Sequence, residues 1–245
     1  MNNKFIIDDE FKELLCIQRH SCRSSRQRLE KYDGEDLYKD LSITYDMFEK
    51  HLPKCVLNVL DVGCGLGYID IVINDRLDSS PNFYMFDAMD SHVSGRVKEF
   101  YSNLKATRRF MLANGVNENN IFLVDASNTG SNNSVNKDPK CFSCGGRYVG
   151  GKKESIKRLP NMDLVVSMYS WGWHFSIKKY IKEVSRIMNT DGLLVLEIKN
   201  HALKQGDTSL CKGREEALIN NNGFSLVDIV KQKESKRQLL IARKL

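Results

Sequence analysis

Short apolar segments alternate with longer amphipathic segments along most of the chain. The short segments are rich in Val, Leu, Ile and aromatic residues, which is typical of buried strands. The longer segments place apolar residues three or four positions apart, which is typical of helices that pack on a core. The predicted strands are 55–61, 82–87, 120–125, 162–168, 192–199, 224–230 and 238–243, and the predicted helices between them are 68–77, 95–114, 176–189 and a segment near 211–222.

Strands that alternate with long helices need crossover connections, and crossover connections build a parallel sheet. The last two predicted strands differ, because only the polar stretch 231–236 separates them, so at least one of them should run antiparallel. The sequence therefore predicts an α/β fold, a three-layer Rossmann-like sandwich. Its sheet has seven strands and is mostly parallel, with one antiparallel strand near the C-terminus.

Two further helices are predicted ahead of the first strand, over 8–31 and 35–51, before Pro53 interrupts the chain. They suggest two parts: an N-terminal helical lid or substrate-side segment, 1–53, and a main domain, 54–245.

The main domain carries an insertion at about 127–160, which is rich in Ser, Asn, Gly and Lys and lacks apolar periodicity. Cys141 and Cys144 form a lone C-x-x-C pair inside it. A tetrahedral zinc site needs four ligands, no second C-x-x-C or H-x-H follows, and Cys211 and His201 are no more than conceivable partners. We therefore expect no metal.

Composition limits the class of protein without naming its partner. The chain has 245 residues, 41% of them hydrophobic and 28% charged, which is ordinary for a globular protein. No apolar run approaches the length of a membrane span, no signal peptide is visible, and the seven cysteines are an odd number. These features favour a reducing, cytoplasmic setting and no membrane partner. The net charge of +6 permits an anionic ligand but does not require one.

The most specific pattern is Val59-Leu60-Asp61-Val62-Gly63-Cys64-Gly65-Leu66-Gly67, in which a strand runs into three alternating glycines and then a helix. Glycines permit a tight turn and let a ligand lie against the backbone. Twenty residues later the second strand ends at Asp87, where an acid can accept the hydroxyls of a ribose. A dinucleotide site would need G-x-G-x-x-G, and Asp61 would repel a pyrophosphate but suit a cationic amino group.

At these residues the sequence resembles the class I S-adenosylmethionine-dependent methyltransferases, whose motif is an acid followed by x-Gly-x-Gly-x-Gly. Asp87 matches the ribose-binding acid of that family, and Asp125-Ala126 resembles the pair near its adenine. Asp191-Gly192 resembles a turn that the family usually writes with two glycines. The resemblance implies S-adenosyl-L-methionine as cofactor and S-adenosyl-L-homocysteine as product. The implied cofactor-binding residues are Asp61, Gly63, Cys64, Gly65, Gly67, Asp87, Ala88, Asp125, Ala126 and Ser167.

In such folds the loop after the fourth strand and the N-terminal helices build the acceptor site. Here the loop is 167–175 and holds Tyr169, Trp171 and Trp173, whose rings could stack on an acceptor or only pack the loop. It lacks the Asn-Pro-Pro-aromatic motif of enzymes that methylate exocyclic amines of DNA bases. Its Ser-x-Trp-Gly-x-His run also resembles a group of bacterial and phage-type methyltransferases that act on sugars.

These features favour O-methylation of a small hydroxylated or sugar-like acceptor. His174 is the candidate catalytic base, because a hydroxyl needs to lose its proton as the methyl arrives. Arg23 and Arg26 could hold an anionic group of the substrate, although a solvated helix face is the simpler and favoured explanation. The alternative is an RNA or other nucleic-acid methyltransferase that uses the basic N-terminal helix and insertion to bind the strand. A third alternative is a non-catalytic binding subunit that keeps the cofactor pocket.

Overall fold

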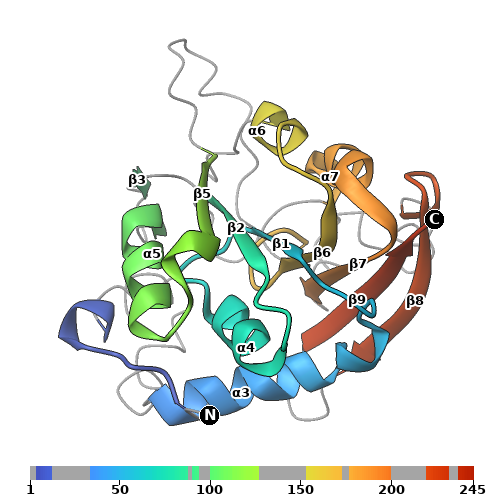
Figure 1. Ribbon diagram of the computed structural model, residues 1–245. Helices are drawn as coiled ribbons and strands as arrows, with labels where there is room; N and C mark the ends of the chain where they lie inside the picture. Colours follow the sequence, from blue (N-terminus) through green and yellow to red (C-terminus); the bar gives the residue numbers. More distant parts are fainter. Residues whose placement is uncertain are drawn as a thin grey trace.

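The computed structural model describes residues 4–12, 34–87, 90–93, 100–126, 153–172, 177–199, 219–231 and 237–245. In this part of the chain, strands alternate with helices as the sequence predicts, and the helices cover the sheet (Figure 1). The helical elements are α3 (Gly34–Asp46), η1 (Glu49–His51), α4 (Tyr68–Arg76), α5 (Leu104–Ala113), η2 (Glu118–Asn120), α6 (Lys153–Lys157), η3 (Ile177–Lys179) and α7 (Ile181–Ile187). The strands are β1 (Asn58–Val62), β2 (Asn82–Asp87), β3 (Asp90–Val93), β4 (Phe100–Asn103), β5 (Ile121–Asp125), β6 (Met162–Ser167), β7 (Met188–Lys199), β8 (Phe224–Lys231) and β9 (Arg237–Lys244).

Seven of these strands form one sheet in the order β5-β2-β1-β6-β7-β9-β8. The five strands from β5 to β7 are parallel to one another, and β9 runs antiparallel to both β7 and β8. This confirms the predicted fold class. The chain proceeds from β1 outward to β2 and β5 and then returns to place β6 on the other side of β1. That reversal makes the carboxyl ends of β1 and β6 the position where open α/β sheets bind ligands.

Alternate residues of the central strands pack into two separate apolar clusters, one on each face of the sheet. On one face, Val59 and Leu164 pack with residues of α3, α4 and α5. On the other face, Leu60 and Val165 pack with residues of α7 and β9. Two clusters separated by one sheet are what a three-layer sandwich requires.

The described part of the N-terminal segment joins the first cluster. The backbone N–H of Phe5 donates to the carbonyl of Gly34, and the Phe5 ring lies edge-on to Tyr38. The ring of Phe11 packs edge-on against Phe110 of α5. Whether 1–53 acts as a lid stays a prediction, since residues 13–33 lie outside the described part.

One predicted helix is wrong at its start. The spacing of apolar residues predicts a helix over 95–114, but residues 100–103 form β4, which pairs antiparallel with β3. The helix begins only at Leu104 because the side chain of Asn103 accepts hydrogen bonds from the backbone N–H groups of Lys105 and Ala106. That cap fixes the first turn of α5 and leaves the preceding aromatic residues extended.

Smaller differences concern element ends. The fifth predicted strand starts four residues early, at Met188, and the predicted insertion contains the short helix α6 at its end. Among the residues described, no helix is both long and apolar enough to cross a membrane.

Candidate active site

The glycine loop follows β1 and takes the conformation that its composition requires. Gly63, Gly65 and Gly67 have φ values of 76°, 57° and 75°, a left-handed region that residues with a Cβ avoid. The N–H of Gly63 donates to the carbonyl of Phe86 (2.7 Å), which joins the loop to β2. A Cβ on Gly67 would lie 2.9 Å from Cε of Met85, so both conformation and space select glycine there.

Cys64 lies in the same loop and is buried. Burial raises the pKa of its thiol well above the ordinary value, and the nearby carboxyls of Asp87, Asp61 and Asp70 raise it further. A neutral thiol in this position is a small packing group. None of the described groups around it activates it as a nucleophile.

Two predicted site acids lie side by side at the ends of adjacent strands. Asp87 of β2 and Asp125 of β5 are register partners in the parallel ladder. Oδ2 of Asp87 accepts a hydrogen bond from the N–H of Gly65 (3.1 Å), and the carbonyl of Asp87 accepts one from the N–H of Ala126 (2.7 Å). The structure therefore brings the glycine loop, Asp87 and Asp125-Ala126 to one edge of the sheet.

Asp61, at the end of β1, is buried and faces a second buried acid, Asp70, in the first turn of α4. Burial raises the pKa of Asp61 well above its ordinary value, and Asp70 and then Asp87 raise it further. Burial also raises the pKa of Asp70, to about 6. Sequence reasoning missed Asp70. The available signal was an acidic residue three positions after the last glycine of the loop.

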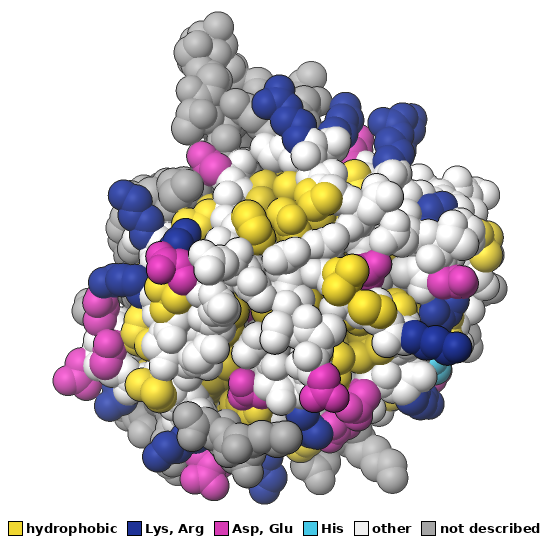
Figure 2. Space-filling model, in the orientation of Figure 1, with side chains coloured by type: hydrophobic (Ala, Val, Ile, Leu, Met, Phe, Trp, Pro, Cys, Tyr) yellow, Lys and Arg dark blue, Asp and Glu magenta, His cyan; other side chains and the backbone are white. Residues whose placement is uncertain are grey.

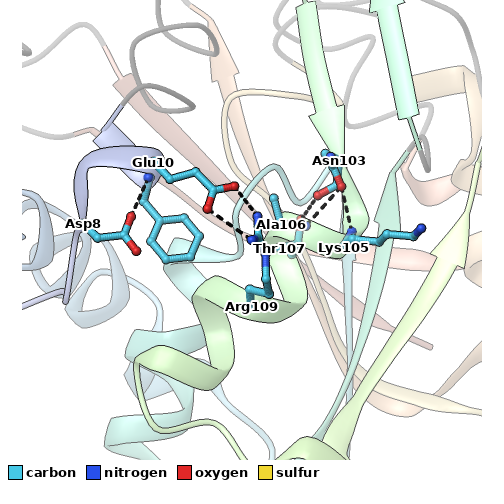
Figure 3. A network of polar contacts seen from close by, with 8 residues as sticks. Asp8, Glu10, Asn103, Lys105, Ala106, Thr107 and Arg109 are labelled. Atoms are coloured by element: carbon cyan, nitrogen blue, oxygen red, sulfur yellow. Dashed lines mark hydrogen bonds and ion pairs between the residues drawn. The ribbon is translucent and has the colours of Figure 1, made fainter.

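Sequence reasoning also missed Thr107, which supports the glycine loop from α5. Its buried hydroxyl donates to the carbonyl of Gly65, and the carbonyl of Asn103 lies farther from the same oxygen, at 3.1 Å. Figure 3 shows Thr107 one turn after Asn103, whose side chain caps the helix. On the same helix, the guanidinium of Arg109 pairs with the carboxylate of Glu10, which ties the N-terminal segment to α5 (Figure 3).

The loop after β6 is held against the end of β1 by Ser167. Its buried hydroxyl donates to the carbonyl of Val62 (2.6 Å) and accepts from the N–H of Trp171 (2.9 Å). Tyr169 has a left-handed backbone with φ of 58°, and Gly172 follows with φ of 88°. A non-glycine residue in that conformation stores strain, which is common in loops that bind ligands.

Trp171 is fully buried in the second apolar cluster, and its ring lies edge-on to Tyr180 at 5.9 Å between centroids. This placement favours the packing alternative over stacking on an acceptor. Its assignment to the substrate site stays a prediction, as does that of Tyr169.

Five predicted site residues lie outside the described part of the chain: Arg23, Arg26, Ala88, Trp173 and His174. The cysteine pair Cys141 and Cys144 also lies outside it. Within the described ranges, no group of three or more His, Cys, Asp or Glu side chains is arranged to hold a metal ion.

Comparison with known proteins bears on the fold. No family model matches the sequence, and no curated protein does. The structure of a candidate O-methyltransferase from Nostoc punctiforme matches with a TM-score of 0.55 at 13% identity, over 84% of this chain and 56% of that one. The mitomycin 7-O-methyltransferase MmcR matches with a TM-score of 0.53 at 9% identity, over 86% and 55%. The O-MT segment of StiE matches with a TM-score of 0.51 at 14% identity, over 98% and 84%.

This chain thus spans little more than half the length of the first two structures. At these identities the likeness establishes the fold alone. The chain has the fold of the class I methyltransferases, so the resemblance drawn from the glycine loop is confirmed at the level of the fold.

Proposed function

We propose that this protein is an S-adenosylmethionine-dependent methyltransferase that methylates a hydroxyl group of a small or sugar-like acceptor. The methyltransferase fold is established above, whereas the activity, the cofactor and the class of acceptor are proposed. It is supported by the residues at the edge of the sheet and by the sequence of the loop after β6.

The observation that carries the proposal is the convergence of Asp61, Asp87 and Asp125 beside a loop of three left-handed glycines. The methyl donor has a cationic amino group, a ribose and an adenine. Asp61 suits the amino group, since its buried Oδ1 has no hydrogen-bond donor among the described residues. Asp87 at the tip of β2 suits the ribose, and Asp125-Ala126 suits the adenine.

S-adenosylmethionine supplies an electrophilic methyl group on a sulfonium. The chain's own residues then have three tasks. The glycine loop and the acids hold the donor, Ser167 fixes the start of the acceptor loop, and His174 removes the proton of the acceptor hydroxyl. Tyr169 and Trp173 would contact the acceptor, while Arg23 and Arg26 would hold an anionic group on it.

The first test is a calorimetric titration with S-adenosylhomocysteine. We expect binding by the wild-type protein and an affinity about 10–100-fold lower for Asp87→Ala, because the change removes charged hydrogen bonds. Asp78→Ala is the matched control, since Asp78 is exposed and follows α4 at the other end from the glycine loop. If the wild-type protein bound neither the donor nor its demethylated product, the proposed function would be wrong.

The second test is a screen for transfer of a radiolabelled methyl group to sugars, small phenols and RNA. Once the screen has identified an acceptor, His174→Ala should lower turnover by about 10²–10⁴-fold and leave the affinity for S-adenosylhomocysteine unchanged. Unchanged turnover would remove His174 from the mechanism. Transfer to none of these acceptors, with the donor bound, would favour a non-catalytic binding subunit.

One observation favours RNA as a second candidate acceptor. Residues 155–158 and 177–187, which include the end of α6 and all of α7, carry six Lys and Arg and one Glu, Glu183, which is buried. Figure 2 shows the basic side chains gathered over these helices. This basic face lies near the candidate site, because Ser155 of α6 donates to the carbonyl of Asp125. Methyl transfer to RNA that weakens steeply with salt would favour this candidate.

A further inference from the structure

Asp61 and Asp70 form a pair of buried carboxyls at the base of the glycine loop. Their relative exposures are 2% and 0%, and the two side chains are within hydrogen-bonding reach of each other. Oδ1 of Asp61 and both carboxyl oxygens of Asp70 have no hydrogen-bond donor among the described residues. A carboxylate oxygen that is buried without a donor is costly, so the pair is incomplete as it stands.

Among the residues that the structure describes, the other ionisable groups that act on the pair are acids as well. Asp87 lies close enough to raise the pKa of Asp61. All three carboxyls raise the pKa of the Cys64 thiol. None of the described groups that shift the pKa of Asp61 or Asp70 is a cation. Two adjacent carboxyls in a low dielectric cannot both ionise cheaply, which favours a single proton shared between them.

We propose that Asp70 is a second member of the donor's ammonium site, and that binding of the ammonium displaces the proton that Asp61 and Asp70 share. The inference rests on the proposed function and goes beyond it, because it assigns a role to Asp70 and couples donor binding to pH. The amino group keeps its own protons, the pair changes from one negative charge to two, and the displaced proton passes to the solvent.

A purely structural role for Asp70 makes a different prediction. Asp70 lies in the first turn of α4, where a carboxylate interacts favourably with the helix dipole. In that role, replacement would lower stability and leave the number of protons released on donor binding unchanged. The proton count therefore separates the two roles.

The test is calorimetry of S-adenosylhomocysteine binding in buffers of different ionisation enthalpy, at about pH 6 and pH 7. We expect the wild-type protein to release about one proton per ligand and its affinity to fall about tenfold as the pH falls by one unit. 5′-Methylthioadenosine, which has the nucleoside and sulfur but no amino group, should bind with no proton release. This comparison needs no variant.

Asp70→Asn keeps the shape of the side chain and removes its charge. We expect it to release fewer protons than the wild-type protein and its affinity to depend less steeply on pH, because the charge of Asp70 no longer raises the pKa of Asp61. Asp75→Asn is the matched control, because Asp75 lies on the same helix and accepts from the hydroxyl of Tyr38 instead. If Asp70→Asn does not fold, the inference is tested by comparing the proton release of the wild-type protein with S-adenosylhomocysteine and with 5′-methylthioadenosine.

The outcomes distinguish failure of this inference from failure of the proposed function on which it rests. S-adenosylhomocysteine that binds without proton release, or a release that Asp70→Asn leaves unchanged, would overturn the inference and leave the methyltransferase proposal standing. Failure to bind S-adenosylhomocysteine at all would overturn the proposed function itself.

Stability of the empty protein gives an independent readout. Both acids have a raised pKa in the folded state, so between about pH 4 and the folded pKa the folded protein binds more protons than the unfolded chain. The contribution of these two acids to the free energy of unfolding therefore falls as the pH rises through this window. Asp70→Asn should make that fall shallower, and an unchanged slope would count against the shared proton.

Discussion

Asp191 has a left-handed backbone, with φ of 64°, at the irregular start of β7. The register between β6 and β7 shifts at this point, because Met162 pairs with Met188 and Leu164 pairs with Leu193. The carbonyl of Asp191 accepts a hydrogen bond from the guanidinium of Arg243 (2.9 Å). The turn therefore needs a conformation that glycine adopts freely, which explains why the methyltransferases that the sequence resembles usually carry glycine here.

Asp191→Gly should stabilise the protein by about 0.5–1 kcal/mol. The change removes the steric cost of the left-handed conformation, and the greater freedom of glycine in the unfolded chain offsets only part of the gain. Chemical denaturation measures the difference. Thr190→Gly, at the exposed neighbouring position, should lower stability instead, and an equal effect of both changes would refute the explanation.

Some residues of the candidate site can be predicted from the sequence, and others cannot. Asp61, Asp87 and Asp125 were predictable because each ends an apolar strand, and the ends of parallel strands meet at one edge of the sheet. Asp70 and Thr107 were not predictable in the same way. Both lie on helices, and which face of a helix meets the glycine loop depends on packing that no local pattern records.

Among the elements, α5 is the support of the glycine loop. Its first turn is fixed by the Asn103 cap, and Thr107 then presents its hydroxyl to the carbonyl of Gly65. The other end of the helix is fixed to the N-terminal segment, where the N–H of Ile6 donates to Oδ1 of Asn114 (2.6 Å). A displacement of α5 would therefore move the loop against which the donor is proposed to lie.

Thr107→Val keeps the shape of the side chain and leaves the carbonyl of Gly65 without its donor. We expect a loss of about 1–3 kcal/mol in unfolding free energy and a several-fold lower affinity for S-adenosylhomocysteine. Thr107→Ser should restore both. Thr44→Val is the matched control, since Thr44 is a buried threonine of α3 whose hydroxyl donates within its own helix, to the carbonyl of Asp40. A loss of affinity in the control would contradict the role of α5.

The wrong start predicted for α5 also has an element-scale cause. Val97, Phe100, Tyr101 and Leu104 are spaced as on a helix, but Phe and Tyr favour strands equally well. The hydrogen bonds of the Asn103 side chain decide between the two structures, and the pairing of β4 with β3 supplies the rest. The spacing of apolar residues does not reveal a helix cap or a partner strand elsewhere in the chain, so it cannot decide whether this segment is helix or strand.

For the whole molecule, alternation of strands and helices was enough to predict the architecture. A seven-stranded sheet with one antiparallel strand follows from the lengths of the connections, and the sheet order agrees with it. The position of the N-terminal segment was harder. Phe5, Phe11 and Leu37 share a core cluster with Val59 of the central strand β1, a long-range contact that composition does not reveal.

The place of β9 between β7 and β8 has a consequence for synthesis on the ribosome. β8 is translated before β9, yet its hydrogen-bonded neighbour in the sheet is β9. Until residues 237–244 emerge, β7 and β8 both present open edges that invite intermolecular pairing. The strands β5, β2, β1 and β6 are all translated earlier, so the half of the sheet that carries the glycine loop can assemble while the other half still waits for its connecting strand.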